Sequence, residues 1–300
     1  EFRSKAKDLL LHPRPGDCLE PGSADALLDA VPMPRAMTFG GNTPCVEMSE
    51  GSDFLIFDCG TGLRALGQNI MARGIPEGSV IDIFQTHTHW DHIMGFPFFA
   101  PALSGKFKIR IHGVHPGLRD RFEAQMDRIH FPITLDEMKS PVEFVQIGSG
   151  DEISLGPFRL ANLGLHHPGG SYAYRVTAGG RSVVFATDCE YTNRDSQSLR
   201  RYVEFYRDAD MLIFDAMYAT IEQTVERMNY GHSTAVIGID IALAAGVKKL
   251  VLFHHDPESD DDHIADCFYR ARDYLASRMH DQSTNHLEIV TSYDGLSVDV

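Results

Sequence analysis

Four side chains that can bind a transition metal lie within the six-residue motif His-Thr-His-Trp-Asp-His, residues 87–92. The motif follows Val80–Gln85, whose apolar run predicts a buried strand. In an extended segment, residues two apart point the same way, so His87 and His89 can bind one ion together. A turn into the next helix would bring Asp91 and His92 towards a second ion. Imidazole nitrogens and carboxylate oxygens are ligands that zinc and related divalent ions accept, and burying them without a metal would be costly.

The motif supplies half of a two-metal site, so the remaining ligands must come from other parts of the chain. Later candidates each follow an expected strand, and strand ends at one edge of a sheet are where sites are usually assembled. These candidates are His166 and His167 after Phe158–Leu163, Asp188 after Ser182–Ala186, and His254, His255 and Asp256 after Lys249–Phe253. Position after a strand leaves His166 or His167 open as alternatives, and likewise His254 or His255.

The order of the expected elements indicates an α/β fold of two mixed β-sheets flanked by helices. Hairpin strands come first and then alternate with helices, within one domain covering residues 36–300. Residues 1–35, with five prolines, form an irregular N-terminal segment. Besides the strands above, we expect strands at Pro44–Glu47, Asp53–Asp58, Phe107–His112, Val142–Ile147, Tyr172–Thr177, Met211–Asp215 and Leu287–Ser292. Helices are expected at Leu63–Arg73, His232–Ala245 and Asp261–Met279, and a helical insertion at Gly117–Met138 whose Phe122 and Met126 would line a substrate pocket.

The composition indicates which binding partners and which cellular compartment to expect. The formal net charge of −15 disfavours a large nucleic-acid footprint, so we expect a small-molecule ester substrate. Five scattered cysteines without a CxxC pair suit a reducing compartment, and the cytoplasm is the expected location. An apolar run long enough to cross a bilayer is absent from the sequence, so no membrane contact is expected. The sequence leaves open whether the chain forms a homodimer.

Several stretches, taken in order, resemble the metallo-β-lactamase superfamily. The HTHWDH motif is similar to its HxHxDH signature. The stretches GGNTPCVEM, FLIFDCGTGLRALG, HHPGGSYAYRV, VVFATDCEY, GHST and LVLFHHDP look like its phosphodiesterase-leaning branch, which includes ribonuclease Z and the phosphoribosyl cyclic phosphodiesterase of phosphonate metabolism. The resemblance covers about residues 37–258 and implies an αββα sandwich with metals at one edge of the sheets.

Carried over residue by residue, the resemblance implies two divalent ions, zinc in the first place, with Mn²⁺ or Fe²⁺ as alternatives. His87, His89 and His167 would bind the first ion. Asp91, His92 and His254 would bind the second, and Asp188 would bridge both. The family's HPG pattern selects His167 over His166, and the distance from the preceding strand favours His254 over His255.

Three further residues have a functional and a structural interpretation. His232, in GHST, is expected to act as a general acid or phosphate contact, although it could merely begin a helix. Tyr191 would face the substrate, or else pack in the core. Asp58 would orient a metal-bound histidine, or else form a turn.

The expected mechanism is attack by a hydroxide held between the metals and oriented by Asp91, with His232 or Tyr191 assisting the leaving group. The first hypothesis is a phosphodiesterase acting on a small nucleotide-like or related diester. The alternative is a hydrolase of carboxyl esters or lactones, including β-lactams and thioesters. A third hypothesis, from another class, is a catalytically idle metal-containing ligand-binding or sensor module. Transfer RNA processing is disfavoured here by the acidic balance and the lack of a Gly-rich arm.

Overall fold

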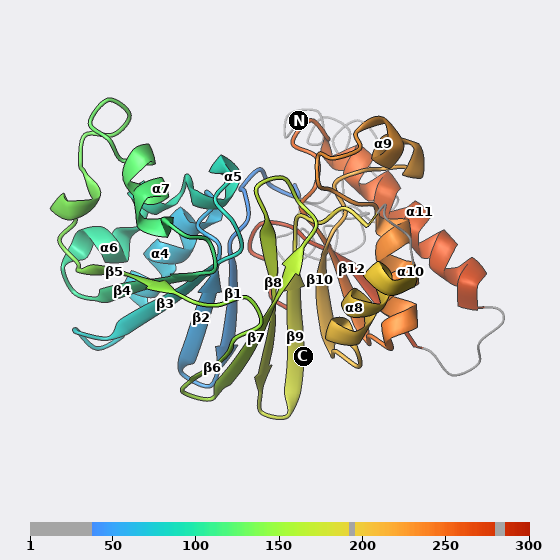
Figure 1. Ribbon diagram of the computed structural model, residues 1–300, viewed down its shortest axis with the longest axis horizontal. Helices are drawn as coiled ribbons and strands as arrows, with labels where there is room; N and C mark the ends of the chain where they lie inside the picture. Colours follow the sequence, from blue (N-terminus) through green and yellow to red (C-terminus); the bar gives the residue numbers. More distant parts are fainter. Residues whose placement is uncertain (1–37, 192–195, 280–285) are drawn as a thin grey trace, which may run out of the picture.

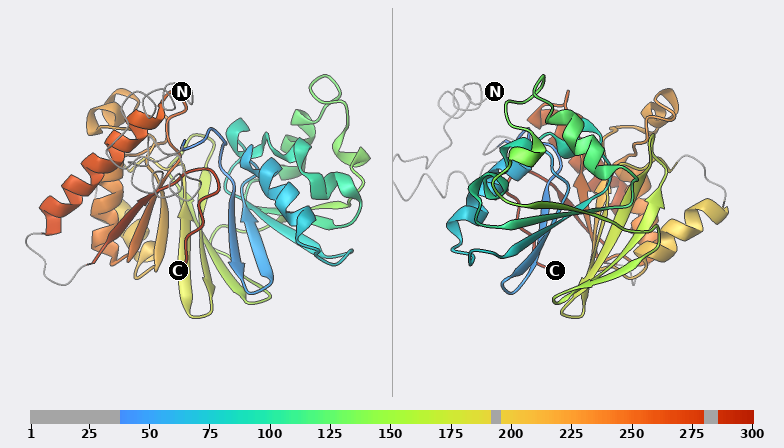
Figure 2. Two further views of the ribbon diagram at one scale, coloured as in Figure 1. Left: turned by 180° about the vertical axis from the view of Figure 1, so that it is seen from behind. Right: turned by 60° about the vertical axis from the view of Figure 1, so that its left-hand side comes forward.

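The computed structural model describes residues 38–191, 196–279 and 286–300. Two β-sheets face each other, and helices cover their outer faces (Figure 1). The turned views show the same four layers from behind and from the side (Figure 2). The expected fold class is therefore confirmed. The expected segment 1–35 lies outside the described residues.

The first sheet holds the strands from the N-terminal half in the order β1-β2-β3-β4-β5. The β1–β2 pair is antiparallel and the other pairs are parallel. These strands are β1 (Val46–Glu50), β2 (Asp53–Phe57), β3 (Val80–Gln85), β4 (Lys108–Gly113) and β5 (Val142–Gln146). Helices α4 (Gly62–Ala72), α6 (Ala100–Ser104) and α7 (Leu118–Gln125) bury apolar side chains against its outer face.

The second sheet has the order β12-β11-β10-β9-β8-β7-β6, antiparallel from β6 to β9 and parallel from β9 to β12. Its strands are β6 (Glu152–Leu155), β7 (Phe158–Leu165), β8 (Ser171–Ala178), β9 (Arg181–Ala186), β10 (Met211–Asp215), β11 (Lys249–Phe253) and β12 (Glu288–Thr291). Helices α8 (Ser196–Tyr206), α10 (Ala235–Ala245) and α11 (Asp261–Met279) cover the outer face.

Aromatic side chains fill the space between the sheets. The ring of Phe57 lies 5.7 Å from Phe84 and 5.9 Å from Phe185, so strands of both sheets contribute to one cluster. Tyr174 packs on Phe57 and donates its hydroxyl to the carbonyl of Gln85 at 2.9 Å. That hydrogen bond satisfies a buried polar group and fixes β8 against the end of β3. The sheets thus form a rigid platform.

The carboxyl ends of the parallel strands reach the same edge of the sandwich, which is the upper edge in Figure 1. Short helices and loops follow there, including α5 (Trp90–Ile93) after β3 and α9 (Ile221–Glu226) after β10. Side chains that directly follow β2, β3, β9 and β11 are therefore brought close together, although they are far apart in sequence.

The structure corrects two expectations about helices and one about the substrate pocket. The helix expected from His232 begins at Ala235, because Thr234 is extended and its hydroxyl caps the Ile237 N–H. The insertion 117–138 is helical only over α7 and a 3₁₀ turn, η2, at Leu135–Glu137. Phe122 and Met126 are fully buried beneath the first sheet, so they do not line a substrate pocket.

Strand β6 and helices α8 and α9 were not expected. Across the described ranges 38–191, 196–279 and 286–300, no helix combines the length and apolar character that crossing a bilayer requires.

Candidate metal centre

Seven side chains expected from the sequence converge at this edge of the sandwich. They form two groups that share one aspartate, and within each group the ligand atoms all lie within 4.8 Å of one another. The groups are His87, His89, His167 with Asp188, and Asp91, His92, His254 with Asp188.

The carboxylate of Asp188 occupies the centre and is almost completely buried. Its Oδ2 lies 3.5 Å from His87 Nε2, 3.3 Å from His92 Nε2 and 3.7 Å from His167 Nε2. Its Oδ1 lies 3.4 Å from His254 Nε2. One carboxylate therefore faces nitrogens from both groups.

An uncommon backbone conformation turns three side chains into this edge. Asp58 directly follows β2 and has a φ of 61°. Asp188 follows β9 after one intervening residue and has a φ of 57°. His254 directly follows β11 and has a φ of 60°. A residue other than glycine rarely adopts a positive φ, and such residues concentrate at functional sites. This left-handed conformation interrupts the alternation of side chains along the strand, so that the side chain points along the edge.

Asp58 is held by several donors and in turn holds His92. Its carboxylate accepts the Thr86 N–H at 2.8 Å, the Thr86 hydroxyl at 2.8 Å and the Gln85 amide at 2.9 Å. His92 Nδ1 lies 2.8 Å from Asp58 Oδ2. This contact fixes the ring so that Nε2 faces Asp188, the role expected for a carboxylate that supports a ligand.

The hydrogen bonds on the far side of each ring decide where the protons are. Gly231 can only accept through its carbonyl, so His167 Nδ1, 2.9 Å away, must donate. Because the Thr86 hydroxyl donates to Asp58, it must accept from His87 Nδ1 at 3.0 Å. Nε2 of His87 and of His167 therefore carries a lone pair near Asp188 Oδ2, and His167 Nε2 also lies 3.0 Å from His89 Nδ1.

Lone pairs that face a buried carboxylate repel it unless a cation lies between them. His87 Nε2 is buried and has no hydrogen-bond partner among the described residues. Burial lowers the pKa of His87 well below its usual value and lowers that of His167 to about 4, so both rings are neutral. These residues fit divalent metal ions, which take neutral imidazole and carboxylate ligands.

His92 and His254 differ from these two rings in their electrostatics. Burial alone would lower the pKa of each. Asp188 and Asp58 together outweigh it at His92 and raise that pKa well above its usual value, and Asp188, Asp91 and Asp215 together raise the pKa of His254 to about 9. A bound cation would have to displace their protons, which links metal affinity to pH.

Neighbouring histidines point elsewhere. His166 is exposed to solvent, whereas His167 is buried in the first group. His255 Nε2 lies 3.1 Å from the Ser292 carbonyl, away from the two groups.

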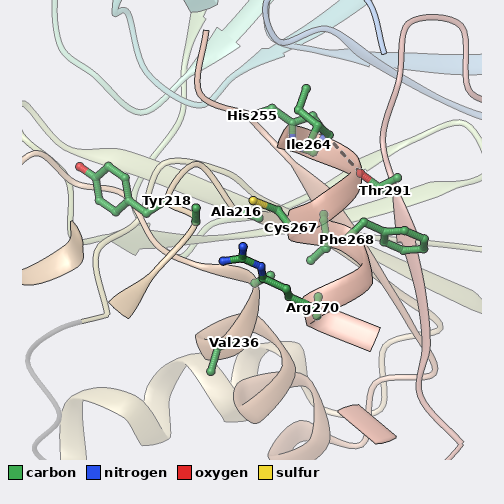
Figure 3. A pocket seen from close by; sticks show the side chains of 13 residues that line it. Ala216, Tyr218, Val236, His255, Ile264, Cys267, Phe268, Arg270 and Thr291 are labelled. Atoms are coloured by element: carbon green, nitrogen blue, oxygen red, sulfur yellow. Dashed lines mark hydrogen bonds between the residues drawn. The ribbon is translucent and has the colours of Figure 1, made fainter. Parts of the chain in front are cut away.

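His255 lines a separate hollow between α11 and the segments that follow β10 and β11 (Figure 3). Its other lining residues include Tyr218, Cys267 and Arg270, and none of the seven side chains of the centre borders it.

His232 lies beside the centre and forms a pair with Asp215. His232 Nδ1 lies 2.8 Å from Asp215 Oδ2, and its ring stacks on His254 with 5.1 Å between centroids. Together with Asp188 and His254, these two residues make a third group of closely spaced ligand atoms. Sequence reasoning missed Asp215, although it ends an expected strand, and the same strand-end rule would have identified it.

Tyr191 lies in the core and not at the centre. It is 2% exposed, and its hydroxyl is 2.7 Å from that of Tyr206. Its ring stacks on Phe214 beneath α8 and α10. The structure thus places Tyr191 in the packing position that was its alternative interpretation, and Cys189 is buried in the same cluster.

Glu190 is another residue that sequence reasoning missed. Its Oε2 accepts the N–H of Asn229 at 2.7 Å and of Gly231 at 3.4 Å. Because Gly231 also binds His167, this carboxylate fixes the loop between α9 and α10 against the centre. In the sequence, its position two residues after Asp188 was the only signal that could have identified it.

Comparisons with known proteins agree with this geometry. Residues 54–255 match the family model described as the β-lactamase superfamily domain. Ribonuclease Z of Picrophilus torridus is 26% identical over 74% of this chain and 82% of its own length. Among solved structures, the metallo-β-lactamase fold protein YhfI from Bacillus subtilis covers 85% of this chain and 90% of its own, with a TM-score of 0.62 and 20% identity. Human tRNase Z, short form, covers 88% and 99%, with a TM-score of 0.58 and 20% identity.

The names of these relatives correct one expectation. A small-molecule ester substrate without a large nucleic-acid footprint was expected, but the relatives are named for the cleavage of RNA. The expectation was wrong in its premise, because the formal charge of a whole chain does not report the charge around one site.

Proposed function

This chain belongs to the β-lactamase superfamily, with the metallo-β-lactamase fold, and on that premise we propose that it is a metal-dependent phosphodiester hydrolase whose substrate is RNA. The family match over residues 54–255 confirms the resemblance indicated by the order of the motifs. The observation that carries the proposal is the pair of donor groups sharing Asp188. The names of the relatives support RNA as the substrate.

We propose two divalent ions, zinc in the first place, with Mn²⁺ or Fe²⁺ as alternatives. His87, His89 and His167 would hold one, Asp91, His92 and His254 the other, and Asp188 would serve both. This mixture of nitrogen and oxygen donors suits zinc and its neighbours in the first transition series better than calcium or magnesium. Such ions supply Lewis acidity to a phosphoryl oxygen and make water nucleophilic at neutral pH.

Asp91 and His232 would act on the reacting groups. The Asp91 side chain is 39% exposed, so it is open to the substrate, and its Oδ2 lies 3.2 Å from His254 Nε2. Although burial would raise the pKa of Asp91, hydrogen bonds to His254 and His92 lower it well below its usual value, so Asp91 is ionised and can accept a hydrogen bond that orients a water. His232 is fixed by Asp215 beside the centre and would contact the phosphate or protonate the leaving oxygen.

The test compares ester classes on the metal-loaded full chain. We expect hydrolysis of bis(p-nitrophenyl) phosphate and of an RNA with a single-stranded 3′ extension, and no turnover of nitrocefin or a lactone. Asp188→Ala should abolish both phosphodiester activities. Turnover of carboxyl esters alone would refute the proposal in favour of the esterase hypothesis. A fully metallated protein that cleaves none of these esters would favour the sensor hypothesis.

A further inference from the structure

Two exposed aromatic side chains adjoin the residues of the centre. Trp90 is 79% exposed and Tyr230 is 66% exposed, more than any other aromatic side chain in the described part of the chain. Most aromatic side chains of a folded protein are largely buried, so rings this exposed beside a reactive centre invite a functional explanation.

Trp90 is held on rigid backbone between two residues of the centre. It is the first residue of α5 and lies between His89 and Asp91. Its carbonyl accepts the Met94 N–H at 2.8 Å, and the His92 carbonyl accepts the Cys59 N–H at 2.8 Å. The backbone of Trp90 therefore cannot move away from the centre without moving these residues as well.

Tyr230 is held in a comparable way on the other side. The N–H groups of Asn229 and Gly231 both donate to Glu190, and the Gly231 carbonyl accepts from His167. A Cβ at position 231 would lie 2.0 Å from His167 Nδ1, so this backbone lies directly against the ring. The short loop after α9 thus presents Tyr230 from a fixed base.

The backbone segments that carry the two rings lie at the open side of the centre. Helices α5 and α9 both lie at the upper edge of the sandwich, α5 on the side of the first sheet and α9 on that of the second (Figure 1). His89 is exposed and the Asp91 side chain is 39% exposed, so this is the side by which a substrate reaches the metal-binding residues.

We propose that Trp90 and Tyr230 stack on the unpaired nucleobases on either side of the scissile phosphate, which rests on the proposed function. Flat aromatic rings bind bases through their faces, largely independently of base identity. Stacking on the bases supplies affinity that does not depend on the charge of the protein.

A protein partner or a second copy of this chain is the other candidate occupant of these rings. Because both rings are fixed to backbone that carries residues of the centre, a stable cover on them would also obstruct the access of substrate. A single-stranded substrate, by contrast, covers the rings only while its phosphate lies at the metals. The geometry favours the substrate.

The first experiment uses the fact that Trp90 is the only tryptophan of the chain, so intrinsic tryptophan emission reports on this side chain alone. Cleavage-resistant phosphorothioate oligoadenylate is titrated into the metal-loaded full chain. We expect saturable quenching, and no quenching by an abasic oligomer with the same linkages. Unchanged emission while the oligoadenylate is bound, as seen by a mobility shift, would overturn the proposal. A change in emission that follows protein concentration without RNA would instead indicate association of two copies.

The second experiment separates a role in stacking from a role in structure. Trp90→Ala and Tyr230→Ala should each raise KM for single-stranded RNA about tenfold, as the loss of one stacked base predicts, with little change in kcat. Trp90→Phe and Tyr230→Phe should retain most of the affinity. On a substrate with abasic sites beside the scissile phosphate, the alanine variants should match the wild type. Tyr269→Ala, on α11 and 44% exposed, is the matched control and should change none of these values.

The outcomes distinguish this proposal from the proposed function. If the wild type cleaves RNA but the alanine variants lose equally on abasic and base-containing substrates, stacking is refuted and the phosphodiesterase stands. If the wild type does not cleave RNA but oligoadenylate still quenches Trp90, the proposed reaction is refuted and base binding stands.

Discussion

At the scale of single residues, Asp188 is the position on which the centre depends most. Its carboxylate faces four imidazole nitrogens at 3.3 to 3.7 Å. Asp188→Ala removes the charge that both donor groups share, so we expect loss of most of the bound metal, measured by elemental analysis of the purified protein. His166→Ala, at the exposed neighbour of His167, is the control and should keep its metal. Equal metal contents in the two variants would contradict the assignment of Asp188.

Asp58 should matter through His92 and not through direct contact with metal. Asp58→Asn weakens the acceptor for His92 Nδ1, and such a change typically costs about 10- to 100-fold in metal affinity. Competition against a chromophoric chelator measures this change in metal affinity. Asp53→Asn, at the exposed start of β2, is the matched control. An affinity equal to that of the wild type would leave Asp58 only the role of a turn former.

Tyr191 should affect folding and leave catalysis unchanged. Tyr191→Phe removes the hydrogen bond to Tyr206, and the free energy of unfolding should fall by about 1 kcal/mol. Denaturant titration measures this loss, and kcat should remain that of the wild type. A large fall in kcat without a loss of stability would instead assign Tyr191 to the reaction.

At the scale of elements, the loop between α9 and α10 provides a test of how backbone positions a ligand. Gly231 has a φ of 88°, and a Cβ there would lie 2.0 Å from His167 Nδ1. Gly231→Ala should therefore displace His167 and lower metal content as well as activity. Gly180→Ala provides a matched control, because Gly180 has a φ of 78° but nothing within 4 Å of the added Cβ. Gly180→Ala should lose only about 1–2 kcal/mol of stability, because of backbone strain, and should keep its metal.

Sequence patterns predicted the elements that have strong local signals. Strands β3, β10 and β11 and helix α11 have the expected bounds, because apolar runs or long periodic segments end at clear turn residues. Strand β6 has four residues, and its place depends on pairing with β7, which no local pattern reports. Helix α9 has six residues and an exposed apolar side chain at Val225, so it shows no buried face to recognise.

The candidate centre could be predicted in part. The 87–92 motif and the strand-end rule identified the residues around Asp188, because parallel strands end at the same edge of a sheet. Position along the chain could not choose between His166 and His167, which differ in burial only once β7 and β8 are formed. It also could not show that Tyr191 points into the core, since the turn after Asp188 sets that direction.

At the scale of the whole molecule, the number of phosphates that the protein contacts determines how RNA binding responds to salt. A protein that neutralises six to ten phosphates loses about 10³- to 10⁵-fold in affinity between about 50 and 200 mM salt. If the substrate is held mainly by stacking and by contacts to about two phosphates at the centre, the loss should be about tenfold. Measuring KM for RNA against salt concentration tests this. A loss of a thousandfold would indicate an extended basic surface.

The seven side chains of the centre do not come from one layer. His87, His89, Asp91 and His92 follow a strand of the first sheet, whereas His167, Asp188 and His254 follow strands of the second. Ions bound between them would join the two sheets of the sandwich at this edge. Removing the ions with a chelator would then remove a structural link between the sheets as well as the catalytic metal. The melting temperature would therefore vary with the concentration of free metal.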